Sequence, residues 1–246
     1  MKIYATLQIG DFHLNHCEDY YVIENIGTNR LLMAVMDGCT MARDSYFAST
    51  LVARILKKIC ITQGYLELYN PGKPDPSLDD QLKLILSELM TSLKQIQEQL
   101  LLEQQDLLTT LILFLADKKE NTGIILAIGD GLVSINGHLT EFDHDNKPDY
   151  LGFHLHHNFD QWYLSLTQKI FIPNIQDVSI ATDGILFFKP CLTVDIPMED
   201  PVELLLHDKS DMDKEDMLDR KLKTLEHVYG LKPTDDIAVI RVIQQT

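Results

Sequence analysis

Four aspartates stand beside apolar segments typical of buried β-strands, and their carboxylates are the side chains best suited to do chemistry in this sequence. They are Asp19 in HCEDYYVI, Asp37 in MAVMDG, Asp183 in SIATDG and Asp235 in TDDIAVI. If these strand ends meet, the carboxylates repel one another and raise each other's pKa unless cations lie between them. Oxygen ligands favour magnesium or manganese over zinc or copper, and two such ions can activate a water molecule beside a phosphoryl group.

An Asp-Gly pair after an apolar stretch also has a simpler interpretation, because it is a common turn signal. For Gly129-Asp130-Gly131, which joins two apolar segments, a tight hairpin turn accounts for the residues fully. The joint occurrence of the acidic sites, rather than any single pair, therefore favours a metal site.

The composition of the 246-residue chain is that of an ordinary globular protein, with 45% hydrophobic and 24% charged residues. A formal net charge of -16 disfavours binding to nucleic acid or to an anionic membrane surface. No apolar stretch is long enough to cross a bilayer, and the first residues lack the pattern of a signal peptide. We therefore expect a cytoplasmic protein, whose scattered cysteines are reduced.

The spacing of apolar residues predicts the elements that must position the acidic groups. Period-two and continuous apolar stretches predict strands at residues 2–10, 19–27, 30–38, within 109–135, at 162–172, 178–184 and 185–188, and after 235. Helical spacing predicts helices at 42–62, from an N-cap at Ser77 to about 105, and from about 210 to a C-cap at Gly230.

This order of elements predicts the fold class. Short turns between neighbouring strands indicate mostly antiparallel pairing. Two groups of helices are available to cover the exposed sheet faces, so we expect an α+β protein, a four-layer α/β/β/α sandwich of two mostly antiparallel sheets flanked by helices. No internal repeat or linker is present, which predicts one domain spanning residues 1–246.

The order of the acidic motifs resembles that of the metal-dependent protein serine/threonine phosphatases of type 2C, in a divergent, bacterial-type form. The resemblance runs over nearly the whole chain, and singly its motifs are weak, but six in the same order are fairly specific. The matching motifs are Glu18-Asp19, Asp37-Gly38, Thr109-Thr110, Gly129-Asp130-Gly131, Thr182-Asp183-Gly184 and Asp235-Asp236.

The resemblance implies a site with two Mn²⁺ or Mg²⁺ ions and, as in some members, a third and weaker one. Asp37 would bridge the two ions and Gly38 would offer its backbone carbonyl to one of them. Asp183 and Asp235 would complete the sphere of one ion, and Glu18 and Asp19 would act on the other, Asp19 partly through water. Asp106, just before the Thr109-Thr110 motif, would lie near the third ion.

The chemistry implied by the resemblance is hydrolysis of phosphoserine or phosphothreonine in a protein, with Asp37 and Asp19 as the catalytic carboxylates. A hydroxide bridging the two metals would attack the phosphorus in one step, without a covalent enzyme intermediate. A phosphorylated protein would be the substrate, and a cognate serine/threonine kinase is an expected partner.

The sequence departs from the family pattern where many members carry an arginine that grips the substrate phosphate. Leu14 stands near that position, and His13, His16 or Arg43 are the candidates to replace the arginine. For each histidine, the favoured interpretation is that of a surface residue of a loop without a special role. The family's glycine-rich stretch after Asp-Gly is also replaced here, by bulkier residues beginning with Cys39.

The missing arginine leaves two alternative functions open. The first is a weak or inactive pseudophosphatase that binds a phosphoprotein partner; the complete carboxylate set opposes it. The second is a hydrolase of small phosphorylated metabolites. A separate feature, HLHH at residues 154–157, could suggest a metal site with His154 and His156 on one face, but a surface histidine run beside a strand is the favoured interpretation.

Overall fold

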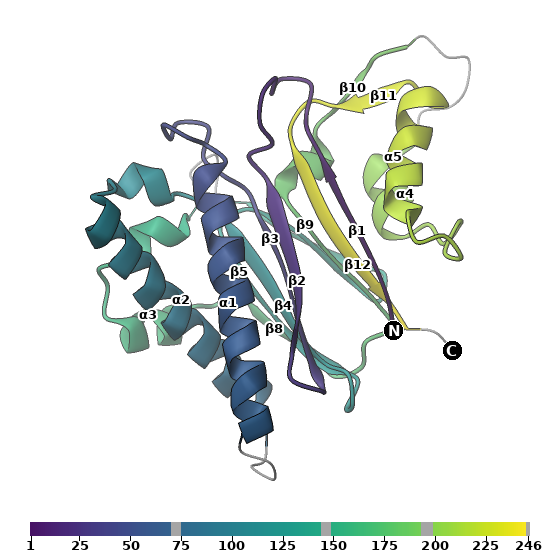
Figure 1. Ribbon diagram of the computed structural model, residues 1–246. Coiled ribbons are helices and arrows are strands. Elements are labelled where there is room, and N and C mark those ends of the chain that lie inside the picture. The colour runs from purple at the N-terminus through teal and green to yellow at the C-terminus, as the bar shows by residue number, and fades with distance from the viewer. Residues whose placement is uncertain (70–74, 144–148, 193–198, 245–246) are drawn as a thin grey trace.

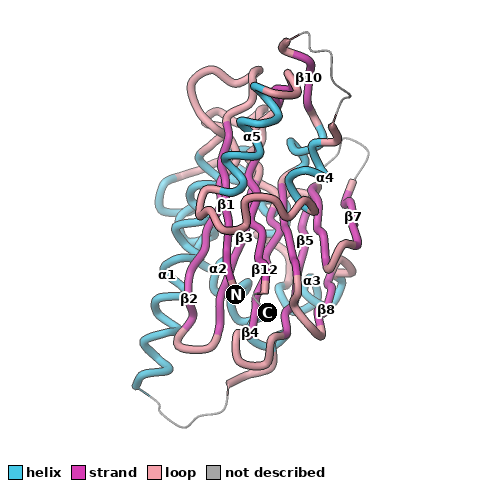
Figure 2. Tube along the Cα trace, turned by 90° about the vertical axis from the view of Figure 1, so that its right-hand side faces the viewer, coloured by secondary structure: helices cyan, strands magenta, loops and turns pink. Residues whose placement is uncertain are grey.

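The computed structural model describes residues 1–69, 75–143, 149–192 and 199–244. Two five-stranded sheets pack face to face, and helices cover the outer face of each (Figure 1). The view turned by 90° looks onto the faces of the sheets, so the strands of both sheets overlap one another there (Figure 2). The predicted four-layer α/β/β/α sandwich is therefore confirmed.

Every strand pair in the described residues is antiparallel. One sheet has the order β1 (Lys2–Gln8), β12 (Ile237–Ile243), β9 (Asp177–Ala181), β6 (Gly131–Ile135), β7 (His138–Phe142). The other has the order β2 (Tyr20–Ile26), β3 (Arg30–Met36), β4 (Leu111–Asp117), β5 (Thr122–Ile128), β8 (Lys169–Ile172). A small separate sheet pairs β10 (Phe188–Pro190) with β11 (Leu231–Pro233).

The helices are divided between the two outer layers (Figure 1). On the β2–β3–β4–β5–β8 sheet lie α1 (Phe47–Tyr69), α2 (Leu78–Leu100) and α3 (Phe159–Ser165). On the other sheet lie α4 (Pro201–Leu206) and α5 (Met217–His227). Three short 3-10 helices, η1 (Gln104–Leu107), η2 (Leu151–His154) and η3 (Asp183–Leu186), complete the described elements.

The hydrophobic core has one layer between the sheets and one layer under each group of helices. Met33, Phe114 and Ile240 belong to the layer between the sheets, and all three side chains are almost fully buried. Because β3 and β4 pack on both faces, their seven residues are buried without alternation. This closely packed core fixes the positions of the strand ends.

Several predicted element boundaries were wrong. The first helix begins at Phe47 rather than at residue 42, because the preceding residues form turns in which Ala42 donates to the carbonyl of Cys39. The second helix was correctly capped by Ser77 but ends at Leu100, where Leu101 adopts a left-handed conformation. The last helix begins at Met217 rather than near 210, with α4 before it.

The segment around Trp162 is a helix, although its aromatic residues predicted a strand. Asn158 caps α3 by accepting a hydrogen bond from the Gln161 amide, and Trp162 and Tyr163 are buried among the residues under α2. Local capping and packing therefore outweigh β-propensity here. Residues 185–188 likewise start in η3 and enter a strand only at Phe188.

The predicted hairpin at Gly129-Asp130-Gly131 is also wrong, because β5 and β6 belong to different sheets. Gly129 and Gly131 both have positive φ, 86° and 148°, which lets the chain cross from one sheet to the other. The crossing leaves Asp130 at the same end of the sandwich as the other acidic strand ends.

A buried arginine ties α4 to the adjacent sheet. The Arg241 guanidinium has 0% exposure and donates to both carboxylate oxygens of Asp177, at 2.9 and 2.8 Å. It also donates to the backbone carbonyls of Leu205, His207 and Asp208 just after and at the end of α4. The planar fork of arginine is needed to reach all of these acceptors at once.

We expect Arg241→Lys to lower the free energy of unfolding by about 2 kcal/mol, because lysine cannot satisfy the bidentate pair and the three carbonyls together. Denaturant-induced unfolding measures the change. Arg220→Lys, at an exposed ion pair with Asp216, is the matched control and should leave the midpoint unchanged. Equal midpoints for the two variants would contradict a structural role for the Arg241 fork.

Candidate metal centre

Asp37 follows directly after β3 and is held by the neighbouring strand. Its backbone N–H donates to the Thr110 hydroxyl at 3.0 Å, and its carbonyl accepts from the Thr110 amide and the Thr109 hydroxyl at 2.9 and 2.7 Å. Gly38 forms a β-bridge with Thr109, and a Cβ at Gly38 would overlap the Ser45 carbonyl. The backbone on both sides of the carboxylate is therefore fixed.

Asp19 reaches the same place from the start of β2. The Thr182 hydroxyl, at the end of β9 in the other sheet, donates to its carboxylate at 2.5 Å, and the Thr182 amide donates to the Ala238 carbonyl. Asp19 is 2% exposed and shares a side-chain hydrogen bond with Asp37. The hydrogen bond from Thr182 to Asp19 thus links the two sheets beside Asp37.

Asp183 and Asp235 approach the same region from the β9 and β12 ends. A Cβ at Gly184 would overlap the carbonyl of Asp236, so only glycine lets η3 pack this closely on the Asp235–Asp236 segment. The charges of Asp235 and Asp130 both act on Asp183. Asp130 therefore lies close enough to Asp183 for its charge to raise the pKa of that carboxyl group.

Burial, followed by mutual repulsion, raises the pKa of these carboxyl groups. It raises the pKa of Asp19 to about 8 and that of Asp183 to about 6, and it raises the pKa of Asp37 well above its usual range. The pKa of Asp235 is also raised, mainly by burial. Without a cation, the site therefore holds carboxyl groups that resist ionisation.

The donor set fits a hard divalent cation by its chemistry. No set of three His, Cys, Asp or Glu side chains in the described residues is already arranged around one point as metal ligands. The side chains of Asp37 and Asp19 interact with each other, and a bound cation would offset the negative charge that burial and mutual repulsion disfavour. Buried carboxylate oxygens with raised pKa values are the groups that Mg²⁺ or Mn²⁺ stabilises in the ionised form.

Glu18 is buried beside this cluster and organises the adjacent loop. Its carboxylate accepts from the Thr40 hydroxyl at 2.9 Å, and its backbone carbonyl accepts from the Gly38 amide and the Ser49 hydroxyl at 3.2 and 2.6 Å. Glu18 therefore connects the β2 start to the loop that follows Asp37.

The three candidates for gripping phosphate lie in different surroundings. His13 is partly buried, with Nδ1 2.9 Å from Asp236 Oδ2; burial lowers its pKa, but Asp236, Glu18 and Asp235 together raise it overall. The exposed ring of His16 packs on Tyr46. The exposed Arg43 guanidinium pairs with Glu103 at 3.1 Å.

Asp106 is engaged in its own turn. Its carboxylate accepts from the Glu103 amide at 2.8 Å, as part of a capping box for η1. Asp19 and Asp37 interact through their side chains, and the charges of Asp183 and Asp235 also act on Asp37. Asp106 shows no such interaction with these carboxylates in the described residues.

Asp236 was not among the predicted site residues, although it is 2% exposed and organises the site. Its carboxylate accepts from the Gly10 amide at 2.7 Å and the Glu18 amide at 2.5 Å, and it lies beside His13. The doubled acid of the Asp235-Asp236 motif was the available signal, since two successive residues at a strand start face opposite sides.

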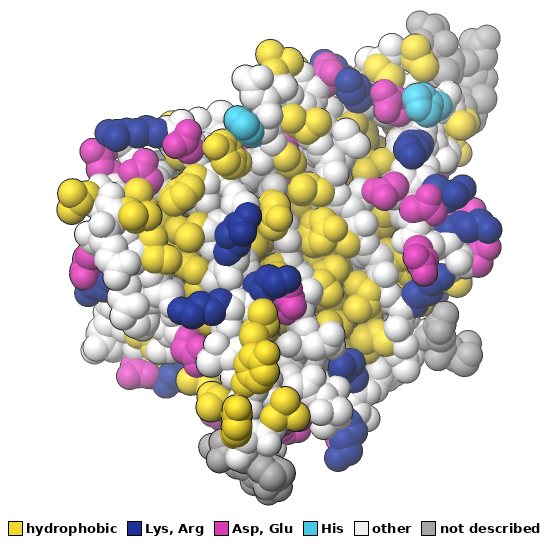
Figure 3. All heavy atoms as spheres, viewed as in Figure 1, with side chains coloured by type: hydrophobic (Ala, Val, Ile, Leu, Met, Phe, Trp, Pro, Cys, Tyr) yellow, Lys and Arg dark blue, Asp and Glu magenta, His cyan; other side chains and the backbone are white. Residues whose placement is uncertain are grey.

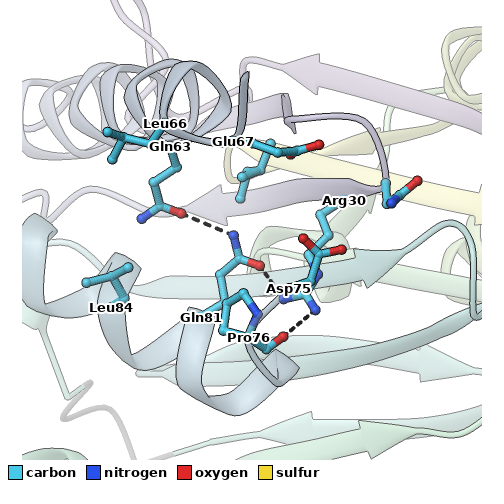
Figure 4. Close-up of a pocket in the computed structure, with 10 residues that line it drawn as sticks. Arg30, Gln63, Leu66, Glu67, Asp75, Pro76, Gln81 and Leu84 are labelled. Atoms are coloured by element: carbon cyan, nitrogen blue, oxygen red, sulfur yellow. Dashed lines mark hydrogen bonds between the residues drawn. The ribbon is translucent and has the colours of Figure 1, made fainter. Parts of the chain in front are cut away.

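A cavity of about 370 Å³ lies elsewhere, beside α1 and α2 rather than at the carboxylates (Figure 4). Leu66 and Leu84 contribute to its apolar wall. A chain of hydrogen bonds runs along it from Arg30 to Gln81 to Gln63, so these polar groups are already engaged. We do not assign the phosphate chemistry to this cavity, because none of the acidic strand ends lines it.

Acidic and basic side chains are interspersed on the molecular face shown in Figure 3. Surface ion pairs of this kind, such as Arg220–Asp216 and Lys214–Asp213, contribute little to stability. The acidic residues at the strand ends therefore affect the energetics of the protein more than these surface ion pairs do. No helix in the described part of the chain is long and apolar enough to cross a membrane.

Comparison with known proteins gives matches over most of the chain. The sequence profile of the family described as protein phosphatase 2C matches residues 10–225. No curated protein matches by sequence.

Solved structures resemble the fold at low sequence identity. A bacterial serine phosphatase aligns with a TM-score of 0.61 and 13% identity, covering 100% of both chains. The serine/threonine phosphatase Stp1 from Staphylococcus aureus has a TM-score of 0.61 and 14% identity, covering 99% of this chain and 95% of that one. RsbX, solved in complex with magnesium, has a TM-score of 0.53 and 10% identity, covering 97% and 92%.

Proposed function

Because the chain belongs to the protein phosphatase 2C family, we propose that it hydrolyses phosphoserine or phosphothreonine in proteins with the help of two Mg²⁺ or Mn²⁺ ions. The single observation that supports this most strongly is the contact between Asp19, which is buried, and Asp37, which is half-buried, two carboxylates beside the ends of adjacent strands whose pKa values are raised. Such a pair has no structural benefit of its own, since it costs stability unless a cation is bound.

The ions would be held by the carboxylates of Asp19, Asp37, Asp183 and Asp235 and by the backbone carbonyl of Gly38. When bound, they would supply the Lewis acidity that activates water and neutralises charge on a phosphoryl group. The third, weaker ion near Asp106 remains part of the proposal.

The chain's own residues orient these ligands. The Thr182 hydroxyl fixes one oxygen of Asp19, and the Thr109 hydroxyl fixes the backbone of Asp37. The Asp236 carboxylate accepts a hydrogen bond from the Glu18 amide and so fixes the position of the backbone just before β2. Rigid orientation of this kind keeps carboxylates in place as charge changes during a reaction.

For the substrate phosphate, we propose His13 as the group closest to the carboxylates, with Arg43 and His16 on the exposed rim. The raised pKa of His13 favours its cationic form beside Asp236 and Glu18. The substrate would be a phosphorylated protein in the cytoplasm, modified by a cognate serine/threonine kinase.

Hydrolysis of a generic aryl phosphate, measured with Mn²⁺, with Mg²⁺ and with a chelator, tests the proposal. Turnover that requires the metal supports a phosphatase. Absence of turnover while calorimetry shows metal bound at the carboxylates would instead favour the pseudophosphatase, with the missing arginine as its physical cause. Turnover of phosphorylated metabolites but not of phosphopeptides would favour the metabolite hydrolase.

We expect Asp183→Asn and Asp235→Asn each to weaken Mn²⁺ binding at one ion by at least about tenfold, because each removes a charged oxygen ligand. Isothermal titration calorimetry measures the two affinities separately. Asp160→Asn, an exposed carboxylate paired with Lys83, is the matched control and should bind as the unaltered protein does. Unchanged Mn²⁺ affinity in both site variants would contradict the shared ion.

A further inference from the structure

Two histidines that share no residue with the carboxylate site face each other on the α2 and α3 side of the molecule. His154 ends η2 and His157 lies three residues later, just before α3. Their Nδ1 atoms are 3.2 Å apart and hydrogen-bonded, so a metal ion bound by both would replace the proton between them. Two nitrogen ligands on one tetrahedral metal ion, each about 2.05 Å from it, stand about 3.3 Å apart.

The lone pairs needed for metal binding are set by a neighbouring carboxylate. His154 Nε2 lies 2.7 Å from Asp149 Oδ1, so Nε2 carries the proton that it donates there. In the neutral form of the ring, Nδ1 of His154 is then the nitrogen with the free lone pair, and it faces His157. A carboxylate that accepts from the far nitrogen of a histidine is the usual second partner of a metal-bound imidazole.

The surroundings leave room for further ligands. A cavity of about 170 Å³ is lined by both histidines and by Trp162, whose buried Nε1 has no hydrogen-bond partner among the described residues. Ordered water in this space could accept from that N–H. No third His, Cys, Asp or Glu side chain completes a ligand set within the described residues, so water would fill the remaining positions.

We propose that His154 and His157 form a binding site for a borderline divalent transition metal ion, of the Zn²⁺ and Ni²⁺ class. Imidazole nitrogen prefers these ions to Mg²⁺, whereas the carboxylates of the other site prefer Mg²⁺. The net charge of -16 raises the local concentration of any cation near the surface. Lys94 lines the same cavity but is exposed, so its ammonium can extend into solvent.

The chain reports on this site directly, because Trp162 is its only tryptophan and its ring stacks on His154 with 5.0 Å between centroids. We expect Ni²⁺, titrated in the presence of excess Mg²⁺, to quench the tryptophan fluorescence in a saturable manner. Zn²⁺ added afterwards should compete with Ni²⁺ and restore the emission.

Four variants locate the ion. His154→Gln and His157→Gln should each weaken the quenching by at least about tenfold, and Asp149→Asn by about tenfold through loss of the partner that orients His154. His156→Gln, at the exposed residue between them, is the matched control and should titrate as the unaltered protein does. His157 is also exposed, so its variant is expected to fold, which circular dichroism checks.

The proposal is overturned if Ni²⁺ causes no saturable quenching, or if His157→Gln and His156→Gln titrate alike. It is also overturned if inorganic phosphate, rather than Ni²⁺, changes the emission in a way that depends on Lys94, since the cavity would then be an anion site. Neither readout depends on phosphatase activity, so the test stands apart from the proposed function.

Discussion

Asp37→Asn is expected to reduce metal-dependent hydrolysis by at least about 10³-fold while the protein stays folded. The loss follows from the position of Asp37 at the joined ends of both sheets, where its carboxylate would bridge two ions. An amide oxygen is a neutral ligand, and it cannot offset the charge of two divalent cations.

The same substitution should not destabilise the metal-free protein. The contacts that fix this residue to Thr109 and Thr110 use its backbone, which asparagine keeps. Burial and the charges of Asp19 and Asp183 raise the pKa of the Asp37 carboxyl, so the protonated form is favoured. Asparagine mimics that neutral form and can still donate to Asp19.

Steady-state hydrolysis of an aryl phosphate and thermal unfolding without metal test both halves of the prediction. We expect near-zero turnover together with an unchanged or higher melting temperature. Residual activity within about tenfold of the unaltered protein would remove Asp37 from the mechanism. A large drop in melting temperature would show instead that the carboxylate has a structural role.

Asp236→Ala is expected to lower the free energy of unfolding by about 3 kcal/mol. The side chain is buried and accepts from the amides of Gly10 and Glu18, and alanine would leave both N–H groups without an acceptor. His13 would lose its nearest carboxylate as well. The segment that contains Glu18 and leads into β2 would then lose its hydrogen bond to the residue just before β12.

The adjacent Asp235 provides the matched control. Its side chain is 47% exposed, so Asp235→Ala should change stability little while weakening metal binding. Denaturant unfolding should show a loss of stability for Asp236→Ala only. Mn²⁺ calorimetry should show weaker metal binding for Asp235→Ala. If both variants unfold at the same denaturant concentration, the two neighbouring acids do not have the separate roles assigned to them.

The two alternative functions differ in what they require of the same residues. A pseudophosphatase would keep the fold but would gain nothing from carboxylates whose burial raises their pKa. The contact between Asp19 and Asp37 therefore favours an enzyme. His13 is partly buried beside Asp236, and Arg43 is paired with Glu103. We therefore expect phosphate to bind more weakly here than it would to an unpaired arginine side chain.

The sequence by itself determined the local features of this protein. Apolar stretches predicted β3 and β4 as strands, and Ser77 predicted the start of α2, because hydrophobic periodicity and capping depend on neighbouring residues only. The acidic residues at strand ends were visible for the same reason. The fold class followed from the order of these elements.

Only the tertiary structure decided which distant residues meet. β1 pairs with β12 at the other end of the chain, and β5 and β6 separate into different sheets, because strand partners are chosen by packing over the whole core. Because of this strand pairing, Asp130 lies near Asp183 instead of in a hairpin turn, and Asp236 is buried where it accepts a hydrogen bond from the Glu18 amide. These neighbours are close in space but distant in the sequence, so the spacing of residues along the chain does not encode them.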